Sequence, residues 1–172
     1  MSMVTFEESK MVFTFEEADI FHIEKSSRFN SISGAMPCEC VVLHDGKVLL
    51  IEAKSSTPQP QKNGKANERF KEFLGEIASK FSDSLTYYTT THLKRQLPDM
   101  VPVNLQSIAL TKHEYEFCLI INGHEKAWLV PVMDQLKITM KKMLKLWGLN
   151  DSCVKVMNEK MALSKGLISA VV

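Results

Sequence analysis

The sequence predicts an α/β protein with a mixed central β-sheet flanked by helices. Two apolar runs, near residues 38–44 and 47–54, flank Asp45-Gly46, and this arrangement is typical of a tight β-hairpin. A long amphipathic pattern over residues 66–96 then predicts a helix. Further strand-like and helix-like segments follow, so strands and helices alternate along the chain.

The register of the hairpin follows from its turn. If Asp45 and Gly46 are the two loop residues, His44 faces Lys47 and Glu39 lies opposite Glu52. Both faces of the hairpin are apolar, which is typical of strands covered on both sides of a sheet. One face carries Val41, Leu43, Val48 and Leu50, and the other carries Cys40, Val42, Leu49 and Ile51.

Weaker patterns predict the other elements. Residues 20–25 alternate between apolar and polar side chains and predict a strand, although Thr14 also begins a sequence that fits a helix capping box. The long helix is expected to end before Pro98. Residues 105–110 and 116–122 predict two more strands.

The C-terminal part of the sequence predicts a second amphipathic helix over residues 133–147, which Gly148 terminates. A short strand is expected over residues 154–157. The apolar tail from Leu163 is consistent with a packed helix.

Length and composition indicate an ordinary globular protein. The 172 residues predict a single domain, with a core over about residues 20–122 and a C-terminal extension over 123–172. The net charge of +1 provides no global basic field, so contact with nucleic acid requires a local patch. The four cysteines contain no Cys-x-x-Cys pair, which argues against a zinc knuckle. No apolar run approaches the ~18 residues of a membrane span and no signal peptide is evident, so a cytoplasmic protein with no membrane partner is expected.

Glu39 and Glu52 are predicted to project together from an otherwise apolar hairpin. Directly opposite residues have Cβ atoms about 4.5–5.5 Å apart. Two carboxylates at that separation repel, and one takes up a proton unless a cation lies between them. Carboxylate oxygens are ligands that Mg²⁺ prefers, with water or phosphate oxygens in its other positions. Glu39 and Glu52 are therefore candidate ligands for Mg²⁺ or Mn²⁺.

Lys54 lies two residues after Glu52 and shares its face of the strand. A lysine beside two carboxylates keeps its proton, so it is better suited to positioning water or stabilising phosphoryl charge than to acting as a free base. Together with a metal, this arrangement suits hydrolysis of a phosphodiester. The alternative is a structural ion-pair network, but two acids and one base leave one carboxylate uncompensated.

An acidic residue in one strand, followed after a hairpin by Glu52-Ala53-Lys54 and then by a helix, resembles the PD-(D/E)XK nuclease superfamily. The resemblance covers roughly residues 20–122. It implies a restriction-endonuclease-like core of αβββαβ type, Mg²⁺ dependence and nuclease activity. The usual aspartate is here Glu39, preceded by Pro37-Cys38 rather than directly by proline. The longer side chain shifts the position at which a metal would lie.

Many members of this superfamily carry an additional upstream acid. Glu24 is the best candidate for it here, ahead of Glu17, and the alternative is a solvated strand end. Four basic residues also gather where the long helix begins, and they form either a phosphate-contacting patch or a solvated helix face. These residues are Lys62, Lys65, Arg69 and Lys71.

These observations lead to the hypothesis of a metal-dependent nuclease that acts on nucleic acid, with DNA favoured. Glu39 and Glu52 are the expected metal ligands, Lys54 the charge stabiliser and Glu24 an additional catalytic acid. A homodimer or a protein partner is expected to supply sequence specificity. The first alternative is a catalytically inactive binding protein with the same fold, and the second is another carboxylate-metal hydrolase, such as a nucleotide phosphohydrolase.

Overall fold

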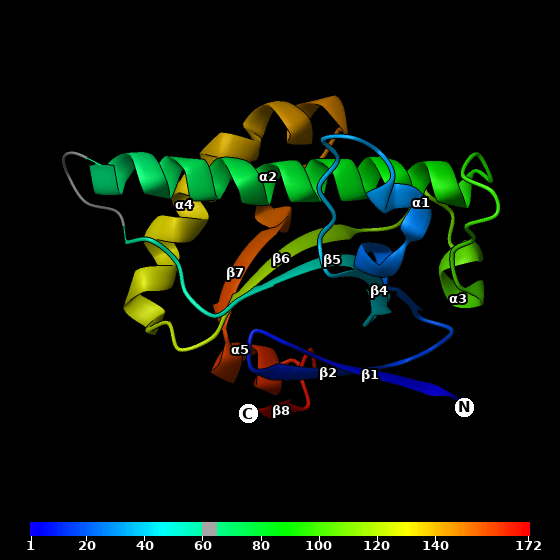
Figure 1. Cartoon of the computed structure of the whole chain (residues 1–172), viewed down its shortest axis with the longest axis horizontal. Coiled ribbons are helices and arrows are strands. Elements are labelled where there is room, and N and C mark those ends of the chain that lie inside the picture. The colour runs from blue at the N-terminus through cyan, green and yellow to red at the C-terminus, as the bar shows by residue number, and fades with distance from the viewer. Residues whose placement is uncertain (60–64) are drawn as a thin grey trace.

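The computed structural model describes residues 1–59 and 65–172. It contains a five-stranded mixed sheet packed against helices, together with a small antiparallel sheet (Figure 1). The predicted α/β class with a mixed sheet flanked by helices is therefore confirmed. In chain order the elements are β1 (Met3–Glu8), β2 (Met11–Glu16), β3 (Ile20–Phe21), the 3₁₀ turn η1 (Ile23–Lys25), α1 (Ser27–Asn30), β4 (Cys40–His44), β5 (Lys47–Lys54), α2 (Lys65–His92), α3 (Val103–Gln106), β6 (Tyr115–Ile121), α4 (Lys126–Leu146), the 3₁₀ turn η2 (Asp151–Cys153), β7 (Val154–Asn158), α5 (Glu159–Ser164) and β8 (Ala170–Val171).

The main sheet has the strand order β3-β4-β5-β6-β7. Its first three strands are antiparallel, whereas β5, β6 and β7 are parallel. Parallel neighbours need a crossover connection. The helix α2 supplies this crossover between β5 and β6, and α4 supplies it between β6 and β7.

The hairpin prediction is confirmed in detail. His44 pairs with Lys47, and the ladder continues to Cys40 opposite Ile51. The loop residues Asp45 and Gly46 have φ angles of 48° and 76°. Positive φ at both loop residues gives the turn a twist that matches the twist of the strands.

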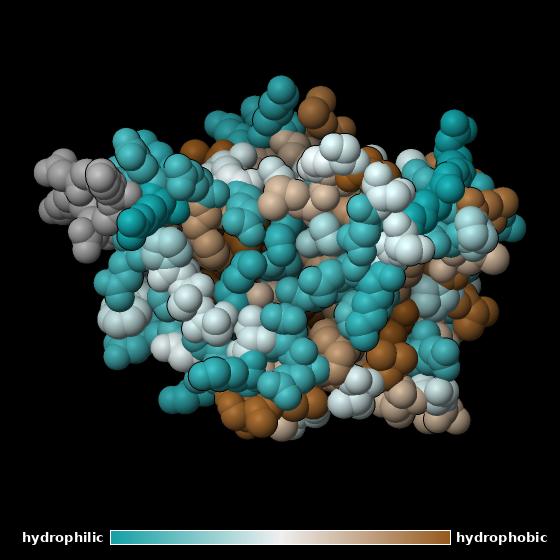
Figure 2. Space-filling view, in the orientation of Figure 1, coloured by the Kyte–Doolittle hydropathy of each residue, from teal (hydrophilic) through white to brown (hydrophobic). Residues whose placement is uncertain are grey.

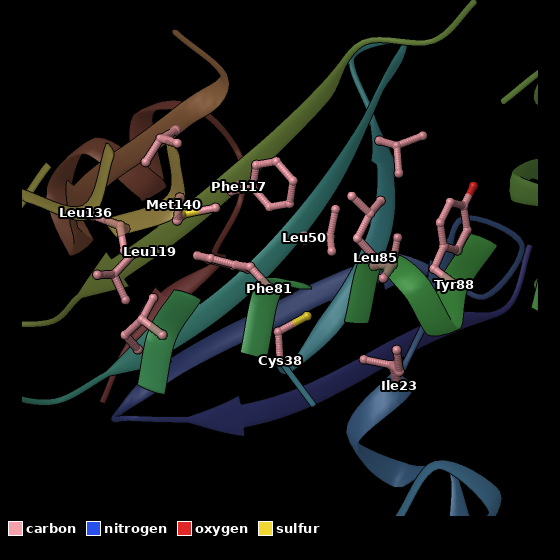
Figure 3. Packing of buried hydrophobic residues seen from close by; sticks show 14 of the residues in the cluster. Ile23, Cys38, Leu50, Phe81, Leu85, Tyr88, Phe117, Leu119, Leu136 and Met140 are labelled. Carbon is pink, nitrogen blue, oxygen red and sulfur yellow. The ribbon is translucent and has the colours of Figure 1, made fainter. Parts of the chain in front are cut away.

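Each face of the main sheet has its own core, as the two apolar faces of the hairpin predict. On one face α2 and α4 pack against residues such as Leu50 and Phe117 (Figure 3). On the other face the small sheet and α5 pack against Leu49 and Ile51, with Phe13 fully buried between them. Both chain termini lie on the side of the small sheet (Figure 1). The visible face that carries α2 is largely hydrophilic, with apolar side chains in separate patches (Figure 2).

The small sheet is the largest difference from the prediction. Its strand order is β1-β2-β8, so it joins the two ends of the chain. The capping-box alternative at Thr14 is wrong, because Thr14 lies in β2 opposite Thr5 of β1. The predicted C-terminal helix is also misplaced: α5 covers Glu159–Ser164, and the tail after it forms β8.

Three other boundaries need correction. The strand predicted over residues 20–25 is limited to β3, and the chain then forms the turn η1. Residues 105–110 do not form a strand: α3 ends at Gln106, and turns follow it. The helix predicted from residue 133 begins earlier, at Lys126, and includes Pro131 near its start. Proline lacks an N–H and usually marks a helix boundary, which explains the late predicted start.

The remaining elements agree with the sequence. The long helix runs over Lys65–His92, and the strands β6 and β7 lie where residues 116–122 and 154–157 predict them. The expected C-terminal extension contributes α4 and β7 to the main sheet and its cover. Among the described residues, no helix is both long and apolar enough to cross a membrane.

Candidate functional site

The hairpin brings Glu39 and Glu52 into the interior of the molecule. Glu52 lies near the end of β5, and Glu39 directly precedes β4. The backbone N–H of Glu39 donates a hydrogen bond to the carbonyl oxygen of Ile51 at 2.9 Å, although the strand ladder pairs Ile51 with Cys40. The regular ladder ends at that pair, so the predicted pairing of Glu39 with Glu52 lies beyond it. Glu39 is 4% exposed and Glu52 is 0% exposed. Charged side chains are almost never buried this deeply without a partner.

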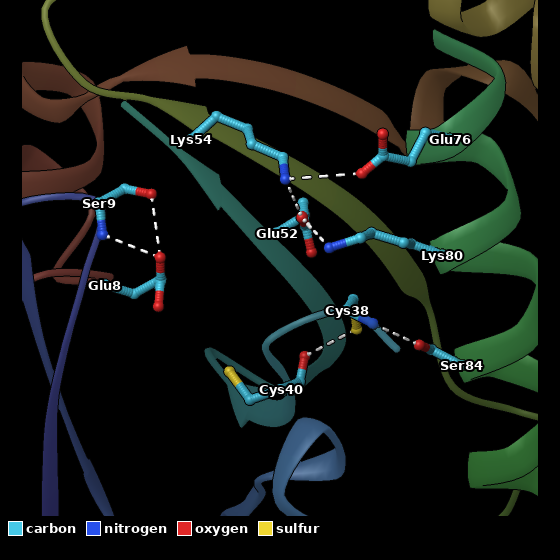
Figure 4. Close-up of polar contacts among 9 residues, drawn as sticks. All are labelled: Glu8, Ser9, Cys38, Cys40, Glu52, Lys54, Glu76, Lys80 and Ser84. Carbon is cyan, nitrogen blue, oxygen red and sulfur yellow. Dashed lines mark hydrogen bonds and ion pairs between the residues drawn. The ribbon is translucent and has the colours of Figure 1, made fainter. Parts of the chain in front are cut away.

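Glu52 is held by two lysines. Its Oε1 atom accepts hydrogen bonds from the Nζ of Lys80 at 2.7 Å and from the Nζ of Lys54 at 3.0 Å. Figure 4 shows the carboxylate between these two ammonium groups. The Nζ of Lys54 also lies 3.9 Å from Oε1 of Glu76. Lys54 therefore joins the cluster as its spacing predicts, with a quarter of its side chain exposed.

A row of polar residues on α2 completes this side of the site. Glu76 reaches Lys54, Lys80 reaches Glu52, and the hydroxyl of Ser84 accepts a hydrogen bond from the N–H of Cys38 at 2.8 Å. The three residues are spaced by four positions, so they lie on one face of the helix. The sequence analysis missed them. In the sequence, these residues could have been recognised as a polar row, spaced by four positions, next to the apolar stripe of the same helix.

Each of the two buried carboxylates keeps one oxygen free. Within residues 1–59 and 65–172, no group makes a hydrogen bond to Oε2 of Glu39 or to Oε2 of Glu52, and both atoms are buried. Leaving such an atom unpaired costs about 1–3 kcal/mol. Once deprotonated, carboxylate oxygens are hard anionic ligands, so these atoms suit a cation such as Mg²⁺.

The surroundings raise the pKa of the Glu39 carboxyl to about 9. Burial is the largest cause, followed by the close approach of the Glu24 carboxyl and by the charges of Glu52 and Glu8. Without a cation, Glu39 therefore holds a proton at neutral pH. A bound cation would take the place of this proton.

The Glu52 group has a different charge balance. Burial raises the pKa of Glu52, while Lys80 and Lys54 oppose this shift. Burial alone would lower the pKa of the Lys80 ammonium, but the charge of Glu52, the hydrogen bond to it and the charges of Glu39 and Glu76 together outweigh burial, so the pKa of Lys80 is raised. Lys80 therefore stays charged and fixes the orientation of Glu52.

Glu24 lies close to Glu39, although not in the strand that the sequence predicts. It belongs to η1, which follows the end of β3. One carboxylate oxygen from each of Glu8, Glu24 and Glu39 lies within 4.8 Å of the other two. The sequence analysis missed Glu8, which ends β1. In the sequence, Glu8 could have been recognised because it continues the alternation of Val4 and Phe6, which lie on the inner face of the strand.

The basic patch predicted at the start of the long helix is only partly described. Lys62 lies outside the described residues. Arg69 and Lys71 are exposed on α2. This exposure agrees with either a phosphate-contacting patch or a solvated helix face.

Comparison with known proteins adds no relative: no protein-family model, no curated protein and no solved structure matches the chain significantly. The function of the site must therefore be inferred from its own residues.

Proposed function

We propose that this protein is a metal-dependent nuclease of the PD-(D/E)XK type, which hydrolyses phosphodiester bonds in nucleic acid, with DNA as the favoured substrate. The observation that carries the proposal is the burial of Glu39 and Glu52 at the end of one hairpin, with Lys54 paired to Glu52. One oxygen of each carboxylate has no hydrogen-bond partner in the part of the chain that the structure describes. The strand order supports the βββαβ part of an αβββαβ core, because three antiparallel strands are followed by a crossover helix and a parallel strand. Among the described residues no helix precedes β3, and the short helix α1 lies between β3 and β4.

Mg²⁺ or Mn²⁺ would be held by Glu39 and Glu52, and when bound it would act as a Lewis acid toward the phosphate. Lys54 lies at the partly exposed end of β5, and in this proposal its ammonium would stabilise negative charge on the phosphoryl group. Lys80 orients Glu52 from behind and is a positioning residue. Glu24 adds a further carboxylate beside Glu39.

The test is cleavage of single-stranded and double-stranded DNA and RNA with Mg²⁺, with Mn²⁺ and with EDTA. Cleavage should require the metal. Glu52→Gln and Lys54→Met should each lower the rate at least about 10²-fold, since the first removes a proposed metal ligand and the second removes the ammonium that would stabilise phosphoryl charge. Lys47→Met is the matched control, because Lys47 lies at the opposite end of the same strand and pairs with Glu114 and Glu116.

Two checks make the result decisive. Far-UV circular dichroism and urea unfolding must show that each variant folds. Cleavage that survives Glu52→Gln or Lys54→Met would overturn the site assignment. Turnover of free nucleotides without cleavage of polymers would instead indicate a nucleotide phosphohydrolase.

One observation favours a second candidate, a binding protein with a catalytically inactive nuclease fold. Lys54 and Lys80 both pair with the same oxygen of Glu52, so its charge is balanced without a metal. In this case neither Mg²⁺ nor Mn²⁺ would raise the melting temperature, and none of the four polymers would be cleaved. Retention of DNA or RNA on a native gel would then measure binding.

A further inference from the structure

Glu8 is an acid on the inward face of an amphipathic strand. Val4, Phe6 and Glu8 alternate along β1, and the first two pack against the core between the small sheet and the main sheet. Glu8 is half-buried on the same face. An acid at such a position needs a partner, because burial disfavours a charge that nothing compensates.

The turn after Glu8 is tied to the end of the main sheet. Ser9 and Lys10 form the tip of the β1–β2 hairpin, with φ angles of 52° and 62°. The side-chain amide of Asn122 donates a hydrogen bond to the carbonyl oxygen of Ser9 at 3.0 Å. Asn122 also donates its backbone N–H to the carbonyl oxygen of Lys54 at 2.8 Å. The hairpin tip is thus anchored at the strand ends that carry the proposed site.

The same turn orients the carboxylate of Glu8. Its Oε1 atom accepts hydrogen bonds from the backbone N–H of Ser9 at 3.1 Å and from the hydroxyl of Ser9 at 3.2 Å (Figure 4). In that view Glu8 and Glu52 lie on opposite sides of β5. Glu8 therefore lies on the side of β5 away from Glu52, which pairs with Lys80 of α2.

Three elements far apart in sequence order deliver the acidic cluster. Glu8 comes from β1, Glu24 from η1, and Glu39 from the residue before β4. Among the ion pairs of the described segments, none joins these acids to a basic side chain. The cluster also contains Glu39, which is 96% buried and whose Oε2 has no hydrogen-bond partner in the part of the chain described.

The spacing of the cluster suits a divalent cation. With oxygens at 2.0–2.6 Å from Mg²⁺ or Ca²⁺, two ligands on opposite sides of the ion lie about 4–5 Å apart. The three carboxylate oxygens lie within 4.8 Å of one another, which is the same range. Small side-chain movements are therefore sufficient to place all three around one ion.

We propose that Glu8, Glu24 and Glu39 form a binding site for a divalent cation that prefers oxygen ligands, with the small sheet supplying one ligand. The inference extends the proposed nuclease site, because Glu39 belongs to both. Cation binding at this cluster is nevertheless independent of any cleavage reaction. In this proposal, the hydrogen bonds of Asn122 to Ser9 and to Lys54 hold the β1–β2 hairpin tip near the strand ends and so keep Glu8 in position to bind the cation.

The test is titration of the intact protein with Mn²⁺ alone, by isothermal calorimetry and by electron paramagnetic resonance of the unbound ion. Glu8→Gln and Glu24→Gln should each weaken binding about 10–100-fold, which is the range for removing a group that supports a metal site. Glu7→Gln is the matched control. Glu7 is the exposed neighbour of Glu8 on the same strand, so this variant should bind Mn²⁺ as the natural protein does.

The outcomes separate this inference from the proposed function. Natural Mn²⁺ affinity in a folded Glu8→Gln variant would overturn the inference, as would the absence of Mn²⁺ binding to the natural protein. Neither result depends on nuclease activity. Conversely, loss of Mn²⁺ affinity in Glu8→Gln together with no cleavage by the natural protein would support the cation site and contradict the nuclease.

Discussion

At the scale of single residues, the buried carboxyl of Glu39 lowers the stability of the folded protein at neutral and alkaline pH. Its carboxyl is buried, one oxygen lacks a hydrogen bond from any described group, and its pKa is raised to about 9. Below pH 4.5, the ordinary value, the folded and unfolded chains both hold the proton. Between pH 4.5 and about 9 only the folded chain keeps it, so raising the pH lowers stability in this window.

Replacing Glu39 by glutamine should therefore stabilise the cation-free protein at pH 8. We expect the free energy of unfolding to rise by about 0.5–2 kcal/mol, a common gain when strain at a functional site is removed. The gain should shrink toward pH 5, near the ordinary pKa of 4.5, where the unfolded chain also begins to hold the proton and folding no longer requires its uptake. Urea unfolding in EDTA at both pH values measures this difference. An equal gain at pH 5 and pH 8 would contradict the assigned titration.

Lys80 is the residue that balances Glu52 from α2. Lys80→Met should lower the free energy of unfolding by about 1–3 kcal/mol, because it removes the shortest hydrogen bond to a fully buried carboxylate. Lys71→Met, at an exposed position of the same helix, should change it by less than about 0.5 kcal/mol. Urea unfolding of both variants is the measurement. Equal changes in the two variants would mean that the Lys80–Glu52 ion pair does not contribute to the free energy of unfolding.

At the scale of elements, the hairpin is stabilised by its Asp45-Gly46 turn, whereas the long helix α2 is stabilised by the burial of its apolar stripe. Two glycines test this difference. Gly46 has a φ of 76°, and nothing lies within 4 Å of the position that a Cβ would take. Gly75 lies inside α2 and is equally open. Backbone conformation alone therefore distinguishes the two sites.

The same substitution should have opposite effects at these glycines. Gly46→Ala should destabilise the protein by about 1–2 kcal/mol, because a side chain opposes the left-handed conformation. Gly75→Ala should stabilise it by up to about 1 kcal/mol, since alanine is the better helix former. Thermal unfolding of both variants gives the two signs. A destabilising Gly75→Ala would show that α2 does not tolerate a methyl group there.

The elements that the sequence predicts well have strong local signals. The Asp45-Gly46 turn determines the register of the hairpin, which the ladder follows from His44 opposite Lys47 to Cys40 opposite Ile51. The long helix follows from a stripe of apolar residues. In contrast, residues 105–110 carry apolar side chains without a clear period, and they form the end of α3 and turns.

At the scale of the whole molecule, the two cores share one sheet. Phe13 of β2 is fully buried in the core beneath the small sheet, whereas both tryptophans, Trp128 and Trp147, lie in or next to α4. The helix α4 packs on the opposite face of the main sheet. A substitution that destabilises the core beneath the small sheet should therefore also change the unfolding reported by the tryptophans on the opposite face.

Phe13→Ala should lower the free energy of unfolding by about 3–5 kcal/mol, the usual cost of emptying a buried aromatic site. If the two faces unfold together, tryptophan fluorescence and far-UV circular dichroism will shift by the same amount in urea. Phe6→Ala, which truncates a partly buried ring of β1, should cost less. An unchanged fluorescence midpoint in Phe13→Ala would show that the small sheet unfolds separately.

The sequence by itself determined the hairpin, its register from Cys40 to Ile51, the long helix, and the pairing of Lys54 with Glu52. These features depend on turn chemistry and periodicity, which act over a few neighbouring residues. Only the tertiary structure decided that Lys80 pairs with Glu52, that Glu8 and Glu24 meet Glu39, and that β8 joins β1 and β2. Each of these contacts joins separate segments of the chain. The periodicity of one segment shows which face a side chain lies on, but only packing decides which other segment it meets.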